Sequence, residues 1–232
     1  MPHTKFWKEL ERRTEKYHLL CHPFYKAWAA GELTREDLRE YARDYYHHVA
    51  AFPEYLEALA GRLPDGELRT AVLENRADEL GMDAAGGRPH HAIWLEFARA
   101  MGAEPTEVVT SRPLPEVLDL IDTFDIVSRT GRPAEVLGAF YAYESQVPEI
   151  AVEKARGLRQ KYGADEAACE YFTLHATADV YHSQVWHDHL ERLIAAHPDQ
   201  EQPALDAAEK AAHALWRALD GIEARRHAPV AS

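Results

Sequence analysis

The chain has 232 residues, 46% of them hydrophobic, and a formal net charge of -13 at neutral pH. This length supports one substantial hydrophobic core, and no linker rich in Gly or Ser divides it, so we expect a single domain over residues 1–232. The negative charge argues against nucleic acid or an anionic membrane as a partner, because both attract positively charged surfaces.

No apolar stretch approaches the ~20 residues of a membrane-spanning helix, and the N-terminus lacks the apolar run of a signal peptide. We therefore expect a cytoplasmic protein. Its two cysteines, Cys21 and Cys169, form neither a CxxC pair nor a disulfide framework, so we expect two reduced thiols that take no part in chemistry.

Apolar residues recur at helical spacing in almost every segment, and no period-two strand is evident, so we predict an all-α fold of roughly seven to eight helices. In chain order, the predicted helices start at Thr4 (to about Leu20, resuming over Phe24 to Trp28), Thr34, Glu67 (to about Leu80), Pro89 (to about Met101), Glu116 (to Ser128), Ala134 (to about Tyr162), Asp165 (to about His197) and just before Leu205.

Some local features refine this outline. Thr34 and Asp37 have the spacing of a capping box, and Pro53 is expected to kink the second helix. The segment 104–115 is expected to be a loop or irregular turn, and the tail 227–232 is expected to fray.

A further proline, Pro148, falls inside the predicted helix 134–162, four residues after Glu144. Proline cannot donate a hydrogen bond to the carbonyl four residues earlier, and its ring pushes that turn open. Glu144 is therefore expected to lie at a bend.

The sharpest pattern lies in the predicted helix 165–197, where His175, Asp179 and His182 stand at i, i+4 and i+7. At about 100° per residue, these side chains project within about 60° of one another and form one stripe. Such a stripe can hold a metal ion, although paired histidines on a helix also serve as ordinary core or surface residues. A metal site therefore needs further ligands from other helices.

Helical bundles usually hold two iron or manganese ions in a carboxylate-rich site of inward-facing residues. Asp179-x-x-His182 is an aspartate form of the acid-x-x-His pair found in such sites, but the sequence has no second Glu-x-x-His in a matching place. The sequence thus disfavours a symmetric, ferritin-type site and favours a less regular one.

Glu79, His90, Glu144 and the run from His175 to His182 resemble, in this order, the ligand pattern of the haem-oxygenase-like di-metal oxidases. This superfamily shares its all-α fold with the thiamine-salvage TenA proteins and pyrroloquinoline-quinone synthase. The resemblance covers most of the chain. It implies a haem-oxygenase-like bundle in which six residues bind two metal ions: Glu79, His90, Glu144, His175, Asp179 and His182. The soft register of the loop before His90 leaves His91 open as the ligand instead.

Within that superfamily the chain resembles the CADD-like para-aminobenzoate synthases, a group named after a chlamydial protein associated with death domains. The resemblance implies a self-sacrificing oxygenase of folate biosynthesis, which cuts up its own tyrosine and takes the amino nitrogen from a lysine. The matching positions are Tyr25, in His22-Pro-Phe-Tyr25, and Lys154. It also implies two irons or one manganese and one iron, dioxygen, an external reductant and a homodimer.

The chemistry of the residues is compatible with these roles. A lysine in a desolvated pocket can have its pKa lowered until its amine is neutral and nucleophilic. Lys154, however, follows Glu144 by about 15 Å along a straight helix, a gap that the bend at Pro148 and the long side chain have to shorten. Tyr141 and Tyr171 lie one turn before Glu144 and His175, where they either assist the metals or simply pack.

Three rival functions stay open at this point. The same site could oxidise an external amino or fatty acid. A TenA-like hydrolase of aminopyrimidines would rely on a nucleophilic cysteine in mid-chain, and the segment 134–162 has none. A metal-free, acidic helical module could instead bind a partner protein, in which case the six ligand types would be a coincidence.

Overall fold

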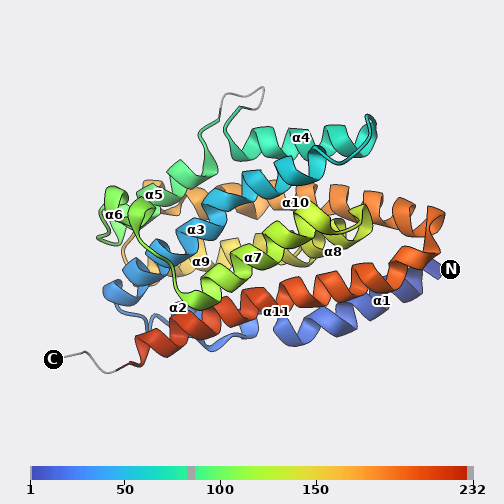
Figure 1. Ribbon diagram of the computed structural model, residues 1–232. Coiled ribbons are helices and arrows are strands. Elements are labelled where there is room, and N and C mark those ends of the chain that lie inside the picture. Colours follow the sequence, from blue (N-terminus) through green and yellow to red (C-terminus); the bar gives the residue numbers. More distant parts are fainter. Residues whose placement is uncertain (1, 83–86, 229–232) are drawn as a thin grey trace.

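Helices make up most of the described chain, residues 2–82 and 87–228, in the computed structural model (Figure 1), and these residues contain no strand. The predicted all-α class is thereby confirmed. The α-helices are α1 (Pro2–Thr14), α2 (Pro23–Ala30), α3 (Arg35–Ala60), α4 (Glu67–Glu79), α5 (His90–Ala100), α6 (Pro105–Thr110), α7 (Pro115–Thr130), α8 (Pro133–Glu144), α9 (Val147–Lys161), α10 (Glu166–Ala196) and α11 (Glu201–Arg226). Short 3₁₀ helices span Glu15–Tyr17, Leu19–Cys21 and Pro198–Gln200.

The start of the chain differs from the prediction. The first helix begins at Pro2, ahead of the expected cap at Thr4, and ends at Thr14 instead of continuing to about Leu20. Proline is favoured in the first turn of a helix, where its missing N–H has no partner to lose. His18 has an extended backbone (φ -64°, ψ 115°), which divides the rest of the segment into two 3₁₀ turns.

The long helix α3 starts at the predicted cap and continues past Pro53. Thr34 and Asp37 form a capping box in which each side chain accepts a hydrogen bond from the other residue's backbone N–H. Pro53 lies inside this helix, which runs on to Ala60. The segment 104–115 contains the short helix α6, where only a loop or irregular turn was predicted.

The prediction of one helix over 134–162 is wrong. The segment is split into α8 and α9 at Ser145 and Gln146, and Pro148 lies in the first turn of α9. The physical reason is the one that predicted a bend, because the missing N–H of Pro148 leaves the carbonyl of Glu144 without its helical partner. With α6, this break gives the described chain more helices than the seven or eight expected.

The longest helix, α10, contacts several other helices of the bundle. It packs against α5, α8 and α9, while α11 lies along α7 and α8, and α3 packs on α4, α5 and α7 (Figure 1). Among the described residues, no helix combines the length and apolar character needed to span a bilayer. The loop expected over residues 83–88, before His90, lies outside the described residues at 83–86, as does the end of the tail at 229–232.

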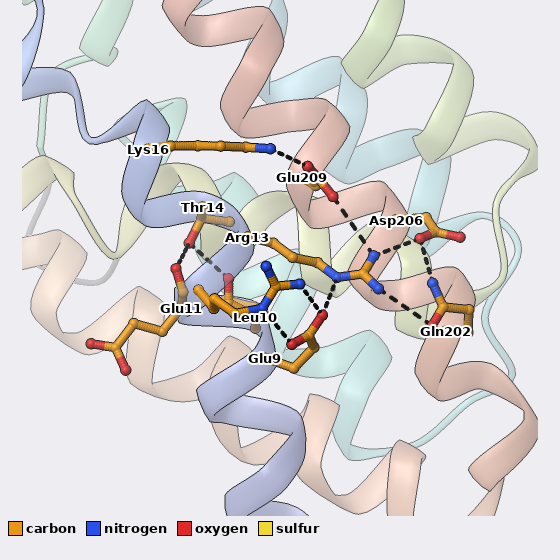
Figure 2. Close-up of polar contacts among 10 residues, drawn as sticks. Glu9, Leu10, Glu11, Arg13, Thr14, Lys16, Gln202, Asp206 and Glu209 are labelled. Atoms are coloured by element: carbon orange, nitrogen blue, oxygen red, sulfur yellow. Dashed lines mark hydrogen bonds and ion pairs between the residues drawn. The ribbon is translucent and has the colours of Figure 1, made fainter.

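Charged side chains of α1 and of the 3₁₀ helix that follows it contact α11 on the surface of the bundle (Figure 2). Arg13 Nη1 lies 2.7 Å from Asp206 Oδ1, and Lys16 Nζ lies 2.7 Å from Glu209 Oε1. Exposed pairs of this kind contribute only about 0–1 kcal/mol each. The buried side chains of Phe6 and Leu10 therefore contribute more to holding α1 in place.

A close approach of α8 to α11 leads to a stability prediction. A Cβ at Gly138 would lie 2.7 Å from the backbone oxygen of Ala204, so Gly138→Ala should force the two helices apart. We expect a loss of about 1–3 kcal/mol in the free energy of unfolding, measured by urea denaturation. Gly61→Ala is the matched control, because its Cβ would meet nothing closer than 3.4 Å. Equal stabilities of the two variants would contradict this packing.

Candidate metal centre

Three side chains of α10 point into the bundle from one stripe. His175, Asp179 and His182 are each at most 5% exposed, and the helix that carries them is continuous over 31 residues. Because neighbouring helices cover this stripe, the three groups lie in the interior, where water cannot solvate their polar atoms. The arrangement has the geometry that the i, i+4, i+7 spacing predicts.

The first group of potential ligands joins three helices. Glu79 is the last residue of α4 and His90 the first residue of α5, and together with His175 they form a cluster whose ligand atoms all lie within 4.8 Å of one another. His90 Nδ1 is 2.9 Å from Glu79 Oε2. His91 is only partly buried and belongs to neither ligand cluster of the described residues. The geometry thus favours His90 over His91.

The second group lies one turn further along α10. Glu144, Asp179 and His182 also have ligand atoms within 4.8 Å of one another, and all three residues are buried. Glu144 is the last residue of α8, at the break caused by Pro148. The indole Nε1 of Trp186 donates a hydrogen bond to Glu144 Oε2, which fixes the orientation of that carboxylate.

Burial and mutual charge set the protonation of these groups. Burial raises the pKa of Glu144 well above its usual value, and the carboxylates of Asp179 and Glu79 raise it further. Burial opposes the charge on His182, yet Asp179, Glu144 and Asp78 raise its pKa to about 10. Burial likewise opposes ionisation of Glu79, but His90 and His175 lower its pKa overall. Glu144 and His182 are therefore groups that hold protons more tightly than usual, and a bound metal ion would have to displace those protons.

The donor set fits two divalent transition-metal ions. Carboxylate oxygens and imidazole nitrogens are the ligands that iron and manganese take in helical bundles. The Nδ1–H of His175 donates to the carbonyl of Tyr171 across 2.7 Å, which leaves Nε2 with a free lone pair for a metal. Each cluster offers three ligands, so each ion would keep open positions for other molecules.

A second buried cluster contains the predicted tyrosine and lysine. Lys154, only 7% exposed, donates from Nζ to the hydroxyl of Tyr25 at 2.7 Å and to that of Tyr41 at 2.6 Å. The two hydroxyls are 3.1 Å apart. Burial lowers the pKa of Lys154 well below its ordinary value and raises those of Tyr25 and Tyr41. Lys154 has no ion pair with a carboxylate in the described part of the chain.

The sequence around Tyr25 explains how its ring is positioned. The His22 side chain caps α2, with Nδ1 accepting a hydrogen bond from the backbone N–H of Phe24, and its Nε2 lies 3.1 Å from Asp220. Trp28 donates from its indole to the backbone carbonyl of Lys154. A Cβ at Gly157 would lie 2.8 Å from the Trp28 ring, so only glycine allows α2 to approach α9 this closely.

A small cavity connects the two clusters. Its volume is about 30 Å³, and its walls include Tyr25, Lys154 and His175. A cavity of this size accommodates about one or two water-sized molecules. The metal ligand His175 and the predicted tyrosine–lysine pair thus face one shared space.

The two other tyrosines named from the sequence have different surroundings. Tyr171 lines the cavity and stacks on His175, with ring centres 4.0 Å apart. Tyr141 instead contacts Trp7, at 5.0 Å between ring centres, in a surface cleft that also borders His187. Although Tyr141 precedes Glu144 by one turn, its ring faces α1, and the structure does not bring it to either ligand cluster.

Several residues of the site were not identified from the sequence: Tyr41, Tyr45, Tyr143, Trp186 and Asp78. Tyr45 and Tyr143 line the cavity, and they come from α3 and α8. Only Trp186 had a readable signal, because it follows His182 by four residues and extends the same stripe. The others depend on how separate helices meet.

Known proteins with similar sequences include redox enzymes and 4-aminobenzoate synthases. Residues 39–216 match the family described as iron-containing redox enzymes. A 4-aminobenzoate synthase from Nitrosomonas europaea is 38% identical over 227 residues, which cover 94% of this chain and 90% of that protein. One from Chlamydia pneumoniae is 35% identical over 217 residues, covering 93% of this chain and 94% of that protein.

The fold has counterparts among solved structures. A domain with a heme oxygenase-like fold from Shewanella denitrificans superimposes with a TM-score of 0.80 at 19% identity, over 96% of this chain and 92% of that one. At this level of identity the match shows the fold alone, and it agrees with the predicted haem-oxygenase-like bundle.

The protonation of the ligand cluster predicts how metal binding depends on pH. His182, with a pKa of about 10, holds a proton at neutral pH that a metal ion has to displace. The apparent affinity should therefore rise with pH, by about tenfold per pH unit for each proton released. Chelator competition with Mn²⁺ between pH 6.5 and 8.5 measures this slope. A pH-independent affinity would contradict the proposed protonation state.

Proposed function

The chain belongs to the family of iron-containing redox enzymes, and from this premise we propose that it is a di-metal oxidase that forms 4-aminobenzoate. In this proposal, the ring comes from the chain's own Tyr25 and the amino nitrogen from Lys154. Dioxygen and an external electron donor are the co-reactants, and the ions are two irons or one manganese and one iron. The names of the two bacterial relatives support the product.

One observation carries the roles of the two residues. The amine of Lys154 lies 2.7 Å from the hydroxyl of Tyr25 and 4.2 Å from the centre of its ring, inside the protein. An amino donor and the ring that receives it have to be held together and away from water, which would compete for an activated ring. This pair meets both requirements before any external substrate is added.

The protonation of the pair supports the same roles. Burial lowers the pKa of Lys154, and a neutral amine has the lone pair that a nucleophile needs. Burial raises the pKa of Tyr25, so its phenol keeps its proton until it is oxidised. Tyr41 accepts a second hydrogen bond from Lys154 and thereby restricts where the amine points.

The metal ions would supply the activation of dioxygen, at the ligands Glu79, His90, Glu144, His175, Asp179 and His182. The protein itself holds Tyr25, the side chain to be oxidised, close to the metal ligands. His175 borders the same cavity as Tyr25 and Lys154. Tyr171 also lines this cavity, and its ring stacks on that of His175. Tyr171 is therefore the better candidate for an electron relay, while Tyr141 lies in the surface cleft beside Trp7.

The rival functions fit less well. Pockets for small-molecule substrates usually have volumes of roughly 300–1,000 Å³, and the cavity at Lys154 has only about 30 Å³. An external amino or fatty acid does not fit the cavity that Tyr25, Lys154 and His175 share, and the larger cleft beside His90 contains neither Tyr25 nor Lys154. A TenA-like hydrolase would lack its cysteine nucleophile at this site, because neither Cys21 nor Cys169 lines the cavity. A homodimer remains part of the proposal by resemblance.

Removing one hydroxyl tests the role of Tyr25. Tyr25→Phe should release no 4-aminobenzoate when purified protein receives iron, manganese, reductant and dioxygen, whereas the parent should release at most one molecule per chain. The loss of two buried hydrogen bonds, with Lys154 and with Tyr41, should lower stability by about 1–3 kcal/mol. Tyr46→Phe, a buried tyrosine on α3 outside the cavity, is the control. Product from Tyr25→Phe, detected by mass spectrometry, would sink the proposal.

The role of Lys154 leads to a joint prediction of activity and stability. Lys154→Met should abolish the product while leaving the free energy of unfolding equal or higher by up to about 2 kcal/mol, because an amine is no longer desolvated. The folded-state pKa of Lys154 is depressed below its unfolded value of 10.5. The parent should therefore gain stability as pH rises towards that value, and the gap to the variant should shrink.

The exposed Lys161 on the same helix provides the matched control. Lys161→Met should keep product formation at the parent level. Denaturation curves at pH 6 and pH 9 measure the stability difference. A Lys154→Met protein that loses several kcal/mol at both values would show that the lysine is structural.

A further inference from the structure

Of the two ring nitrogens of His182, only one can face a metal ion, and the other has a partner outside both ligand clusters. His182 Nδ1 lies 3.3 Å from Asp179 Oδ1, within its own cluster. His182 Nε2 lies 3.2 Å from Asp78 Oδ2, a carboxylate that belongs to neither cluster. Asp78 directly precedes the ligand Glu79 at the end of α4.

We propose that Asp78 is a positioning residue of the metal centre, which accepts the Nε2–H of His182 and thereby turns the lone pair of Nδ1 towards the ion bound by Glu144 and Asp179. A metal-binding histidine needs its second nitrogen fixed, because the ring otherwise rotates or changes tautomer. A carboxylate at that nitrogen also makes the imidazole a stronger donor to the metal. This inference rests on the proposed function only in requiring the two metal ions.

The two ligand clusters differ in the group that accepts a hydrogen bond from the histidine of α10. His175, in the Glu79 cluster, is held by the neutral backbone carbonyl of Tyr171, whereas His182 is held by the carboxylate of Asp78. The Glu144 cluster therefore has two carboxylates as ligands and a third behind its histidine. The Glu79 cluster has one carboxylate as ligand. Loss of Asp78 should therefore weaken the binding of the ion in the Glu144 cluster and leave the affinity for the ion in the Glu79 cluster unchanged.

The surroundings of Asp78 connect the centre to solvent. Its side chain is 38% exposed, while that of His182 is only 4% exposed. Asp78 lines a cleft of about 680 Å³ between α4, α5 and α10, and the ligand His90 lies in the wall of the same cleft. Asp78 thus lies at the boundary between water and the buried ligands.

Charge in the cleft is an alternative explanation for any effect of Asp78 on metal binding. Glu166 and Glu170 also line this cleft. Each pairs with an arginine, Glu170 with Arg88 at 3.0 Å and Glu166 with Arg159 at 2.7 Å, so the carboxylate of Asp78 is not the only acidic group there. A negative cleft attracts divalent cations in general. Glu166→Gln removes one charge from the same cleft without touching a ligand, and it is therefore the control for this effect.

The test measures the binding of Mn²⁺ without dioxygen, by chelator competition and elemental analysis, in the full chain. Asp78→Ala should bind one of its two ions about 10–100-fold more weakly than the parent, and Asp78→Asn, which keeps an oxygen acceptor, should lose less. Glu166→Gln should retain both affinities. Thermal unfolding of the metal-free proteins should be similar for all four.

Several results would overturn the proposal. Parent-like affinities for both ions in Asp78→Ala would do so, as would an equal loss in Glu166→Gln, which would assign the effect to general charge. A metal-free Asp78→Ala protein that unfolds much earlier than the parent, with unchanged affinities, would make Asp78 structural. If the parent binds two ions but forms no 4-aminobenzoate, the proposed function fails while the affinities still decide the role of Asp78.

Discussion

The structure depends on the burial of ionisable side chains around α10. Three carboxylates and three imidazoles from four helices, α4, α5, α8 and α10, meet in the interior with at most 6% exposure. Burying such groups is unfavourable unless they are paired or bind metal ions. Two divalent cations would compensate the buried negative charge, so metal binding and correct packing of these helices should be linked.

The second buried ionisable site, Lys154, is stabilised differently from the metal ligands. No carboxylate of the described residues pairs with its amine, which instead donates to Tyr25 and Tyr41 and loses basicity by burial. The break between α8 and α9 makes this possible. Lys154 does not have to extend along a straight helix towards Glu144. It instead lines the same cavity as His175, which comes from a different helix.

The sequence predicted those parts of the molecule that follow from one helix at a time. The stripe of His175, Asp179 and His182 and the capping box at Thr34 depend only on spacing, so periodicity sufficed. The break at Ser145 was missed, since a proline can either kink a helix or start a new one, and packing decides between them. Asp78 and Tyr41 gave no signal, because their partners come from other helices.

The central claim is that the chain itself becomes the product. It can be tested by producing the protein with ring-¹³C tyrosine and ε-¹⁵N lysine, then supplying unlabelled iron, manganese, reductant and dioxygen. Mass spectrometry of the released 4-aminobenzoate should show both the labelled ring and the labelled nitrogen. Unlabelled 4-aminobenzoate, or product that forms only when an external compound is added, would contradict the claim.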